Sequence, residues 1–158
     1  MAKSLADQVL RKIGEARELY HRLILVVGPP GSGKTEALQE VSASASASLI
    51  NVNLELSRRM LDLTERQRAL QVPRLLRGIV SEATGEVVLL DNIELLFDVR
   101  LKQDPLHLLQ RLSRDKTVVA TWSGSIVDGH ITYAVPGHPE YRRYPIRDFV
   151  SLDVKVSK

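Results

Sequence analysis

The sequence contains no cysteine and few aromatic residues. Without cysteine it forms no disulfide and offers no thiolate ligand to a metal ion. Aromatic residues make up 4% of the chain and do not alternate with basic residues as they do on base-stacking surfaces. No apolar run approaches the roughly 20 residues that span a membrane, and residues 1–7 lack the apolar block of a secretory signal. These absences predict a cytoplasmic protein without a membrane segment.

The 158 residues are enough for one domain with a hydrophobic core. We expect a single domain over residues 1–158, with an N-terminal helix over about 4–20 and a core over about 22–156. The net charge is +3, but residues 58–77 hold six arginines against two acids. Such a stretch is able to bind nucleic acid or an acidic partner, whereas the ordinary interpretation is a solvated helix face.

The most informative segment is glycine-rich and follows the apolar run at residues 23–27. It reads Gly-Pro-Pro-Gly-Ser-Gly-Lys-Thr and matches the phosphate-binding (Walker A) pattern G-x-x-x-x-G-K-[ST]. Backbone N–H groups and a helix N-terminus form an anion cradle there. In this pattern Lys34 reaches the β- and γ-phosphates and the Thr35 hydroxyl binds Mg²⁺. The residues expected to hold ATP are Gly28, Pro29, Pro30, Gly31, Ser32, Gly33, Lys34 and Thr35.

Predicted strands and helices alternate along the chain. We expect strands over 23–27, 49–53, 86–90, 117–122, 131–135 and 149–156, and helices over 34–41 and from Ser57, Thr64 and Pro105. Residues 42–48 read as a frayed helix end and loop, and Pro73 predicts a kink or a restart. The alternation predicts an α/β fold of three layers, with a mostly parallel central sheet and helices on both faces. Ligand is then expected beyond the carboxyl ends of the strands.

A second part of the site follows the third strand, which ends at Asp91. An apolar strand ending in an acid is the Walker B pattern, whose carboxylate helps to hold Mg²⁺. The next residue is Asn92, where many such ATPases place a glutamate that polarises water. Asparagine positions a water but does not accept its proton. Glu94 is the candidate base, because a chain that stayed extended would place it on the same side as Asn92. These residues predict slow or partner-dependent hydrolysis.

The fourth strand ends in polar residues that are candidates for sensing the γ-phosphate. Thr121 and Ser123 are both eligible, and Thr121 is the preferred candidate. An arginine from a neighbouring subunit accelerates hydrolysis in related enzymes. The eligible arginines are Arg111, Arg114, Arg142, Arg143 and Arg147, and the sequence favours none of them. The histidines, His21, His107, His130 and His138, lack paired metal-ligand spacing and are interpreted as non-catalytic.

Two further segments are distinctive, Asp-Asn-Ile-Glu at 91–94 and Pro-Gly-His-Pro-Glu-Tyr at 136–141. With them, residues from about 20 to 148 resemble the BrxF family of small P-loop proteins from type 3 bacteriophage exclusion (BREX) systems. The resemblance implies an AAA+-like ATPase core from which the C-terminal helical lid is absent. It also implies partners, namely a large ATPase, an adenine DNA methyltransferase, an alkaline-phosphatase-like protein and a helicase. A core without a lid puts ring assembly and autonomous hydrolysis in doubt.

Three functions remain open from the sequence. The first is an ATPase or ATP-switch subunit of a phage-defence complex, with DNA contacted through residues 58–77 and self-association possible. The second is a nucleotide-binding scaffold that does not hydrolyse ATP, which Asn92 favours. The third is a small-molecule kinase with residues 129–147 as a basic lid. A GTPase is disfavoured, because the guanine-reading segment Asn-Lys-x-Asp is absent.

Overall fold

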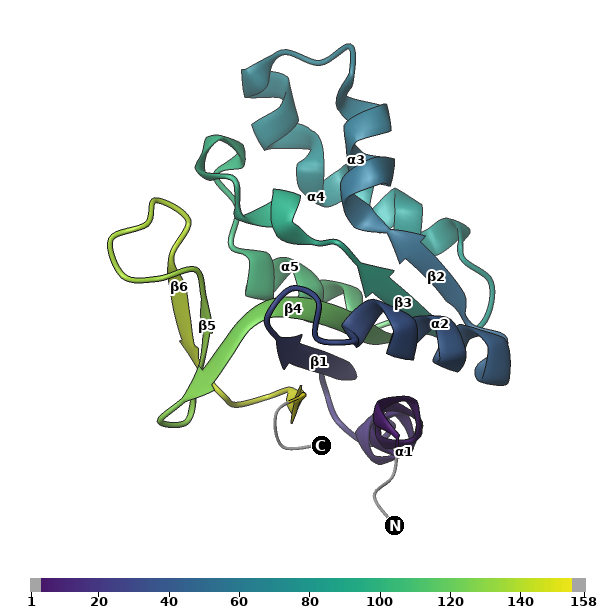
Figure 1. Ribbon diagram of the computed structural model, residues 1–158. Coiled ribbons are helices and arrows are strands. Elements are labelled where there is room, and N and C mark those ends of the chain that lie inside the picture. Colours follow the sequence, from purple (N-terminus) through teal and green to yellow (C-terminus); the bar gives the residue numbers. More distant parts are fainter. Residues whose placement is uncertain (1–3, 155–158) are drawn as a thin grey trace.

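The computed structural model describes residues 4–154, and a seven-stranded sheet forms its centre (Figure 1). Five strands are parallel in the order β2-β3-β4-β1-β7. Their bounds are Leu23–Gly28 for β1, Ser48–Asn51 for β2, Val87–Asp91 for β3, Thr117–Val127 for β4 and Val150–Asp153 for β7. The remaining two, β5 (His130–Tyr133) and β6 (Arg142–Pro145), extend the far end of β4 as an antiparallel hairpin. The predicted mostly parallel sheet is therefore confirmed.

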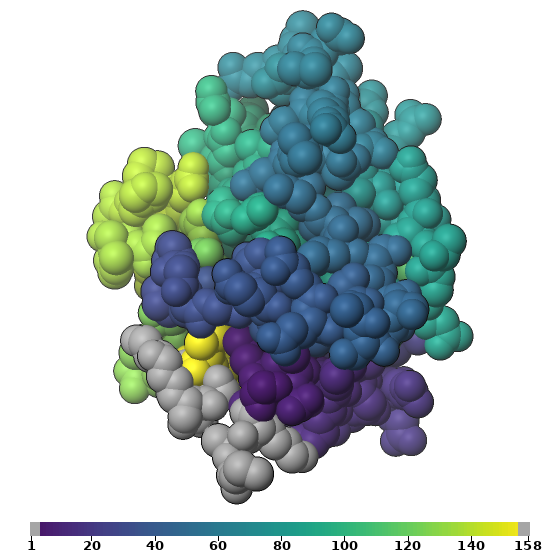
Figure 2. Space-filling view, turned by 45° about the vertical axis from the view of Figure 1, so that its right-hand side comes forward, coloured from purple at the N-terminus to yellow at the C-terminus, as the bar shows by residue number. Residues whose placement is uncertain are grey.

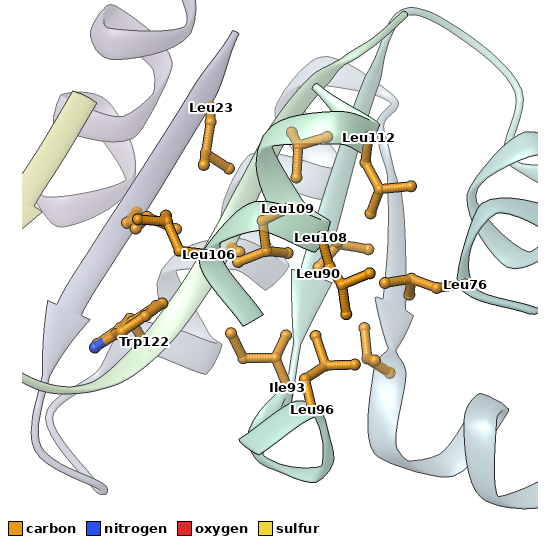
Figure 3. Packing of buried hydrophobic residues seen from close by; sticks show 14 of the residues in the cluster. Leu23, Leu76, Leu90, Ile93, Leu96, Leu106, Leu108, Leu109, Leu112 and Trp122 are labelled. Carbon is orange, nitrogen blue, oxygen red and sulfur yellow. The ribbon is translucent and has the colours of Figure 1, made fainter. Parts of the chain in front are cut away.

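Helices cover both faces of this sheet, as expected for three layers. The helices are α1 (Leu5–Ala16), α2 (Lys34–Ala45), α3 (Val52–Met60), α4 (Glu65–Glu82) and α5 (Pro105–Leu112), with short 3-10 helices η1 (Glu94–Phe97) and η2 (Val99–Leu101). Successive strand residues point to opposite faces. Ile24 and Leu89 accordingly pack in the cluster that holds α1 and α2. Leu90 packs with the leucines of α4 and α5 on the other face (Figure 3).

Local capping signals explain where several helices begin. Ser4 caps α1 by accepting a hydrogen bond from the backbone of Asp7. Thr64 and Gln67 form the predicted capping box of α4. Asp104 caps α5, whose first residue is a proline, also as predicted. Each cap satisfies a backbone N–H that the first helical turn leaves without a partner.

Several predicted boundaries are wrong. Helix α1 ends at Ala16 rather than near residue 20, and α2 continues to Ala45 through the stretch read as a loop. Strand β2 ends at Asn51, because this side chain caps α3 by accepting from the backbone of Leu54. Helix α3 therefore starts at Val52, five residues before the predicted start at Ser57. Strand β4 is longer than predicted, and residues 155–156 of the last predicted strand lie outside the described residues.

Pro73 neither ends nor restarts α4, which runs through it without interruption. A proline lacks the N–H that would bond the carbonyl four residues earlier, here that of Ala69. The side chain of Gln103 takes this role, because its Nε2 donates to the Ala69 oxygen over 2.7 Å. The helix therefore continues because a residue distant in sequence satisfies the carbonyl that Pro73 leaves free.

After α5 the described chain contains only strands and turns. The hairpin of β5 and β6 projects beside the end of the sheet where β1 and β3 finish (Figure 1). Within residues 4–154, no helix has both the length and the apolar composition needed to cross a membrane.

Candidate functional site

A cleft of about 610 Å³ lies beyond the carboxyl ends of the parallel strands. Its walls come from the loop after β1, the end of β3, the middle of β4 and the loop between β5 and β6. In Figure 2 the surface of that last loop (yellow-green) adjoins the surface of the loop after β1 (dark blue). The lining residues are Pro30, Gly31, Gly33, Lys34, Thr35, Glu36, Asp91, Asn92, Glu94, Thr121, Ser123, Tyr133, Ala134, His138 and Glu140. The cleft therefore lies at the edge of the sheet where the sequence analysis expects a ligand.

The loop of residues 28–35 curls around the side chain of Lys34. Gly33 precedes α2 with a φ of 94°, in the left-handed region that favours glycine. The Lys34 ammonium donates to the carbonyl oxygens of Gly28 and Pro29, over 2.8 and 2.7 Å. Burial lowers the pKa of Lys34, while the charges of Glu94, Asp91 and Glu36 act in the opposite direction. A buried ammonium at the start of a helix makes this end of the cleft a site for an anion.

Asp91 joins the loop to the neighbouring strands through both carboxylate oxygens. Thr35 Oγ1 donates to Oδ2 over 2.7 Å, and Thr121 Oγ1 donates to Oδ1 over 2.7 Å. The backbone N–H of Asn92 also donates to Oδ1, over 3.0 Å. Asp91 and Thr121 are both buried. The carboxylate is therefore held in one orientation, with one oxygen facing the hydroxyl of the phosphate-binding loop.

The oxygens of Thr35 and Asp91 fit a magnesium ion. Mg²⁺ takes oxygen ligands in an octahedral shell at about 2.1 Å, so neighbouring ligands lie about 3 Å apart. The 2.7 Å between Thr35 Oγ1 and Asp91 Oδ2 is close to that spacing. A hydroxyl and a carboxylate are also the oxygen types that this ion accepts.

Asn92 and Glu94 reach the cleft along a path that the sequence did not predict. The chain is not extended after Asp91, because Asn92 has a φ of 52° and Glu94 begins η1. The condition on which Glu94 was expected beside Asn92, an extended backbone, is therefore not met, although Glu94 does line the cleft. Burial raises the pKa of the Glu94 carboxyl, and the charge of Asp91 raises it further. A carboxyl so placed binds a proton more readily than an ordinary glutamate.

Asn53 fixes this turn, although no sequence pattern assigned it a role in the site. Its backbone N–H donates to the carbonyl oxygen of Asn92 over 2.9 Å. Its side-chain Oδ1 accepts from the backbone of Leu95 over 2.8 Å. Asn53 therefore clamps the turn on both sides of Glu94. The sequence carries no local signal for this contact, because 42 residues separate the bonded pair.

The last residue of β5 and the loop between β5 and β6 contribute lining residues that were not predicted from the sequence. These are Tyr133, Ala134, His138 and Glu140. His138, interpreted from the sequence as non-catalytic, lies in the distinctive segment 136–141 and lines the cleft. No arginine of residues 4–154 lines the cleft. Among the arginines proposed as fingers, Arg142 instead donates to the backbone of Gln103 over 2.7 Å.

The chain is similar to known ATPases over most of its length. The model of the ATPase family associated with various cellular activities (AAA) matches residues 24–121, which run from β1 to the Thr121 of β4. No curated protein sequence matches at a significant level. Among solved structures, PCH-2 from C. elegans is similar, with 16% sequence identity and a TM-score of 0.44. That match covers 94% of this chain but only 41% of PCH-2, so the chain spans less than half of that protein's length.

Proposed function

The chain belongs to the AAA family of ATPases, and from this premise we propose that its cleft binds ATP with Mg²⁺ and hydrolyses it slowly or with help from a partner. The observation that carries the proposal is the hydrogen bond between Thr35 and Asp91. Thr35 belongs to the Walker A segment, and Asp91 ends the Walker B strand. The two bonded oxygens line the same cleft as the buried ammonium of Lys34. A triphosphate with its metal is the ligand that uses all three groups at once.

Each side chain then has a separate task in binding. Lys34 exchanges the loop carbonyls for phosphate oxygens, since an ammonium prefers a charged acceptor. Thr35 and Asp91 would hold the metal, which would supply positive charge against the phosphates. No group of three or more histidine or acidic side chains within residues 4–154 is arranged to hold a metal alone. Phosphate oxygens and waters would therefore complete the shell, as is usual for Mg²⁺.

Hydrolysis requires a water positioned against the terminal phosphate. Glu94 is the residue proposed to accept its proton, because it lines the cleft with a pKa raised by burial. Asn92 would help to orient the water, and Thr121, in the middle of β4, would hold Asp91 in place beside the γ-phosphate. With no arginine of the described chain in the cleft, charge that develops in the transition state lacks its usual partner. A second subunit or another protein would have to supply it.

The biological setting is a further part of this proposal. It rests on the likeness of residues 91–94 and 136–141 to the BrxF family of BREX phage-defence systems. In that setting the partners would be the large ATPase, the DNA methyltransferase, the phosphatase-like protein and the helicase of such a system, with self-association also open. DNA contact is proposed for α4, where Arg66, Arg74 and Arg77 are exposed.

A scaffold that binds ATP without turnover is the alternative, and Asn92 is the observation that favours it. Adding DNA and the partner proteins to a turnover assay separates the two. If both Glu94→Gln and Asp91→Ala abolish a measured rate, the scaffold is excluded. A rate that stays at background under every condition supports it.

Calorimetry with ATP and Mg²⁺ tests the proposed ligand. The wild-type protein is expected to bind, and Lys34→Ala is expected to lose most of the affinity because the triphosphate loses its buried cation. Lys12→Ala on α1 is the matched control, since it removes the same charge outside the cleft. Equal binding by wild type and Lys34→Ala would remove the loop from the proposal.

A further inference from the structure

The hairpin of β5 and β6 forms one wall of the cleft and is fixed to the core. Strand β4 continues past the cleft, and its Gly124 pairs with Tyr133. A Cβ at Gly124 would overlap the carbonyl oxygen of Thr132, so only glycine permits this pairing. The indole N–H of Trp122 donates to the same Thr132 oxygen over 3.0 Å. The ring of Tyr133 stacks on Phe97, with 3.6 Å between their centroids.

Beyond Tyr133 the loop turns back through hydrogen bonds centred on His138. The backbone N–H of His138 donates to the Val135 oxygen, and the backbone N–H of Tyr141 donates to the His138 oxygen, each over 3.0 Å. The backbone N–H of Glu140 donates to Nδ1 of His138, also over 3.0 Å. Because Nδ1 accepts, the proton of the neutral imidazole is on Nε2. His138 therefore carries an N–H donor on the nitrogen that the loop does not use.

The charges around the cleft make such a donor valuable. Carboxylates of Glu36, Asp91, Glu94 and Glu140 line it, and Lys34 is the only lining side chain of residues 4–154 with a permanent positive charge. Repulsion from these acids opposes a triphosphate in the cleft, and each hydrogen bond donated to a phosphate oxygen offsets part of that cost. Burial raises the pKa of Tyr133 to about 12, so its hydroxyl stays protonated.

The position of the β5–β6 hairpin relative to a bound triphosphate follows from strand β4. The residues of β4 that face the cleft are Thr121, bonded to Asp91, and Ser123, which directly precedes Gly124. If Asp91 lies at the metal and Lys34 at the outer phosphates, then the β5–β6 hairpin, which pairs with the far end of β4, faces the terminal phosphate. A diphosphate would leave that position empty.

We propose that His138 is a positioning residue that donates its Nε2–H to the terminal phosphate, so that the β5–β6 loop distinguishes a nucleoside triphosphate from a diphosphate. The inference rests on the ATP site proposed above. It assigns a role to the segment 136–141, which has none in the binding of ATP by the phosphate-binding loop and Asp91. Under this proposal, the loop between β5 and β6 senses the γ-phosphate.

The test is the ratio of the dissociation constants for ADP and ATP, measured by calorimetry with Mg²⁺. We expect His138→Ala to weaken ATP binding about tenfold, the usual size for a hydrogen bond to a charged group, and to leave ADP binding unchanged. His138→Gln should retain the wild-type ratio, because its amide N–H is able to occupy the place of Nε2. His138→Asn should not, because its amide occupies the place of Nδ1.

His130→Ala is the matched control, since His130 lies in the same hairpin but does not line the cleft. Its ratio should equal that of the wild type. The inference is overturned if His138→Ala keeps the wild-type ratio or weakens ATP and ADP equally, or if glutamine restores no more than asparagine. Wild-type protein that binds neither nucleotide overturns the proposed ATP site itself, and the inference with it. Circular dichroism of each variant shows whether the hairpin change has left the fold intact.

Discussion

The hydroxyl of Thr35 donates a hydrogen bond to the carboxylate of Asp91, with 2.7 Å between Oγ1 and Oδ2. Thr35 lies in the first turn of α2, whereas Asp91 is the last residue of β3. Strand β4 separates β1 from β3 in the sheet, but all three are parallel, so the segments that follow them emerge at the same edge. Sheet topology therefore brings together two oxygens that are 56 residues apart in the chain.

The first prediction concerns the metal. Thr35→Ala should reduce the gain in ATP affinity on adding Mg²⁺ by about tenfold or more, because one oxygen ligand is removed. Thr35→Ser keeps the hydroxyl and should behave as the wild type. Titrations of ATP with Mg²⁺ and with excess chelator measure the effect. An unchanged magnesium dependence in Thr35→Ala would show that this hydroxyl does not hold the ion.

The second prediction concerns stability rather than binding. Thr121 is buried and donates to Asp91 Oδ1 over 2.7 Å. Thr121→Val keeps the shape but removes the donor, and should lower the free energy of unfolding by about 2 kcal/mol, typical for a hydrogen bond to a charged group. Thr121→Ser should lose less, since the hydroxyl remains. Urea unfolding measures both, and equal stability of the valine variant and the wild type would contradict the expectation.

The sequence predicts the part of the site whose residues lie in continuous motifs. The pattern at residues 28–35 is continuous in the chain, and the apolar strand before Asp91 is unambiguous. A parallel sheet then requires both to lie at one edge. For these parts, motif and topology were sufficient to bring Lys34, Thr35 and Asp91 into one cleft.

The rest of the site depends on contacts distant in sequence. Strand β6 is short and ends in a proline, so it shows no periodicity from which pairing with β5 is predictable. Asn51 is the last residue of β2, and its side chain also caps α3, so the two predicted strand residues that follow it lie in the helix instead. Glu94 is the candidate base on the condition of an extended backbone, but it reaches the cleft after a turn at Asn92 instead. Its position depends on Asn53, whose contact with Leu95 no local pattern reveals.

The third prediction tests the support of Pro73 by Gln103. Gln103→Met removes the donor to the Ala69 carbonyl while keeping the length of the side chain, and should cost about 1 kcal/mol of stability. In a Pro73→Ala background that cost should shrink, because residue 73 then has its own N–H to give to Ala69. A double-mutant cycle by urea unfolding measures the coupling. Additive effects would mean that Gln103 does not replace the missing helical bond.

The fourth prediction is a pH dependence. Burial and the charge of Asp91 raise the pKa of Glu94 in the folded protein. A folded state with a raised carboxyl pKa holds its proton more tightly than the unfolded state, so stability is lost as pH rises through that pKa. Glu94→Gln cannot ionise, so its stability should rise relative to the wild type as pH rises from the ordinary glutamate pKa to the raised one. The difference should stay constant at higher pH. At a pH below the ordinary pKa of glutamate, about 4.3, this contribution should vanish.

Unfolding in urea at a series of pH values measures this difference between Glu94→Gln and the wild type. Glu40→Gln, on the exposed side of α2, is the control for removing a negative charge from the surface. A Glu94→Gln difference that is constant with pH, or that grows toward acid, would contradict the raised pKa. If Glu94→Gln gains stability but loses turnover, the result would agree with a catalytic base whose burial costs the protein stability.

The fifth prediction concerns the proposed DNA contact. Arg66, Arg74 and Arg77 occupy exposed positions of α4 at intervals of eight and three residues, which place them along one side of the helix. Within residues 4–154 none of the three forms an ion pair, whereas Arg59 is held by Glu55 and Glu82. Changing all three to glutamine should weaken DNA binding and make it less sensitive to salt. Removing one arginine–phosphate interaction lowers the magnitude of the log–log salt slope by about 0.9.

Fluorescence anisotropy of labelled duplex DNA over a range of salt concentrations measures that slope. Arg58→Gln is the matched control, because this arginine lies in the same basic stretch but is paired with Glu55 over 3.3 Å. Its slope should change less, since Glu55 competes with DNA phosphates for this guanidinium. If the paired and unpaired arginines contribute equally, the stretch acts through net charge alone and α4 forms no defined contact. If the triple variant keeps the wild-type slope, DNA does not bind at this helix, and the basic face is a solvated surface.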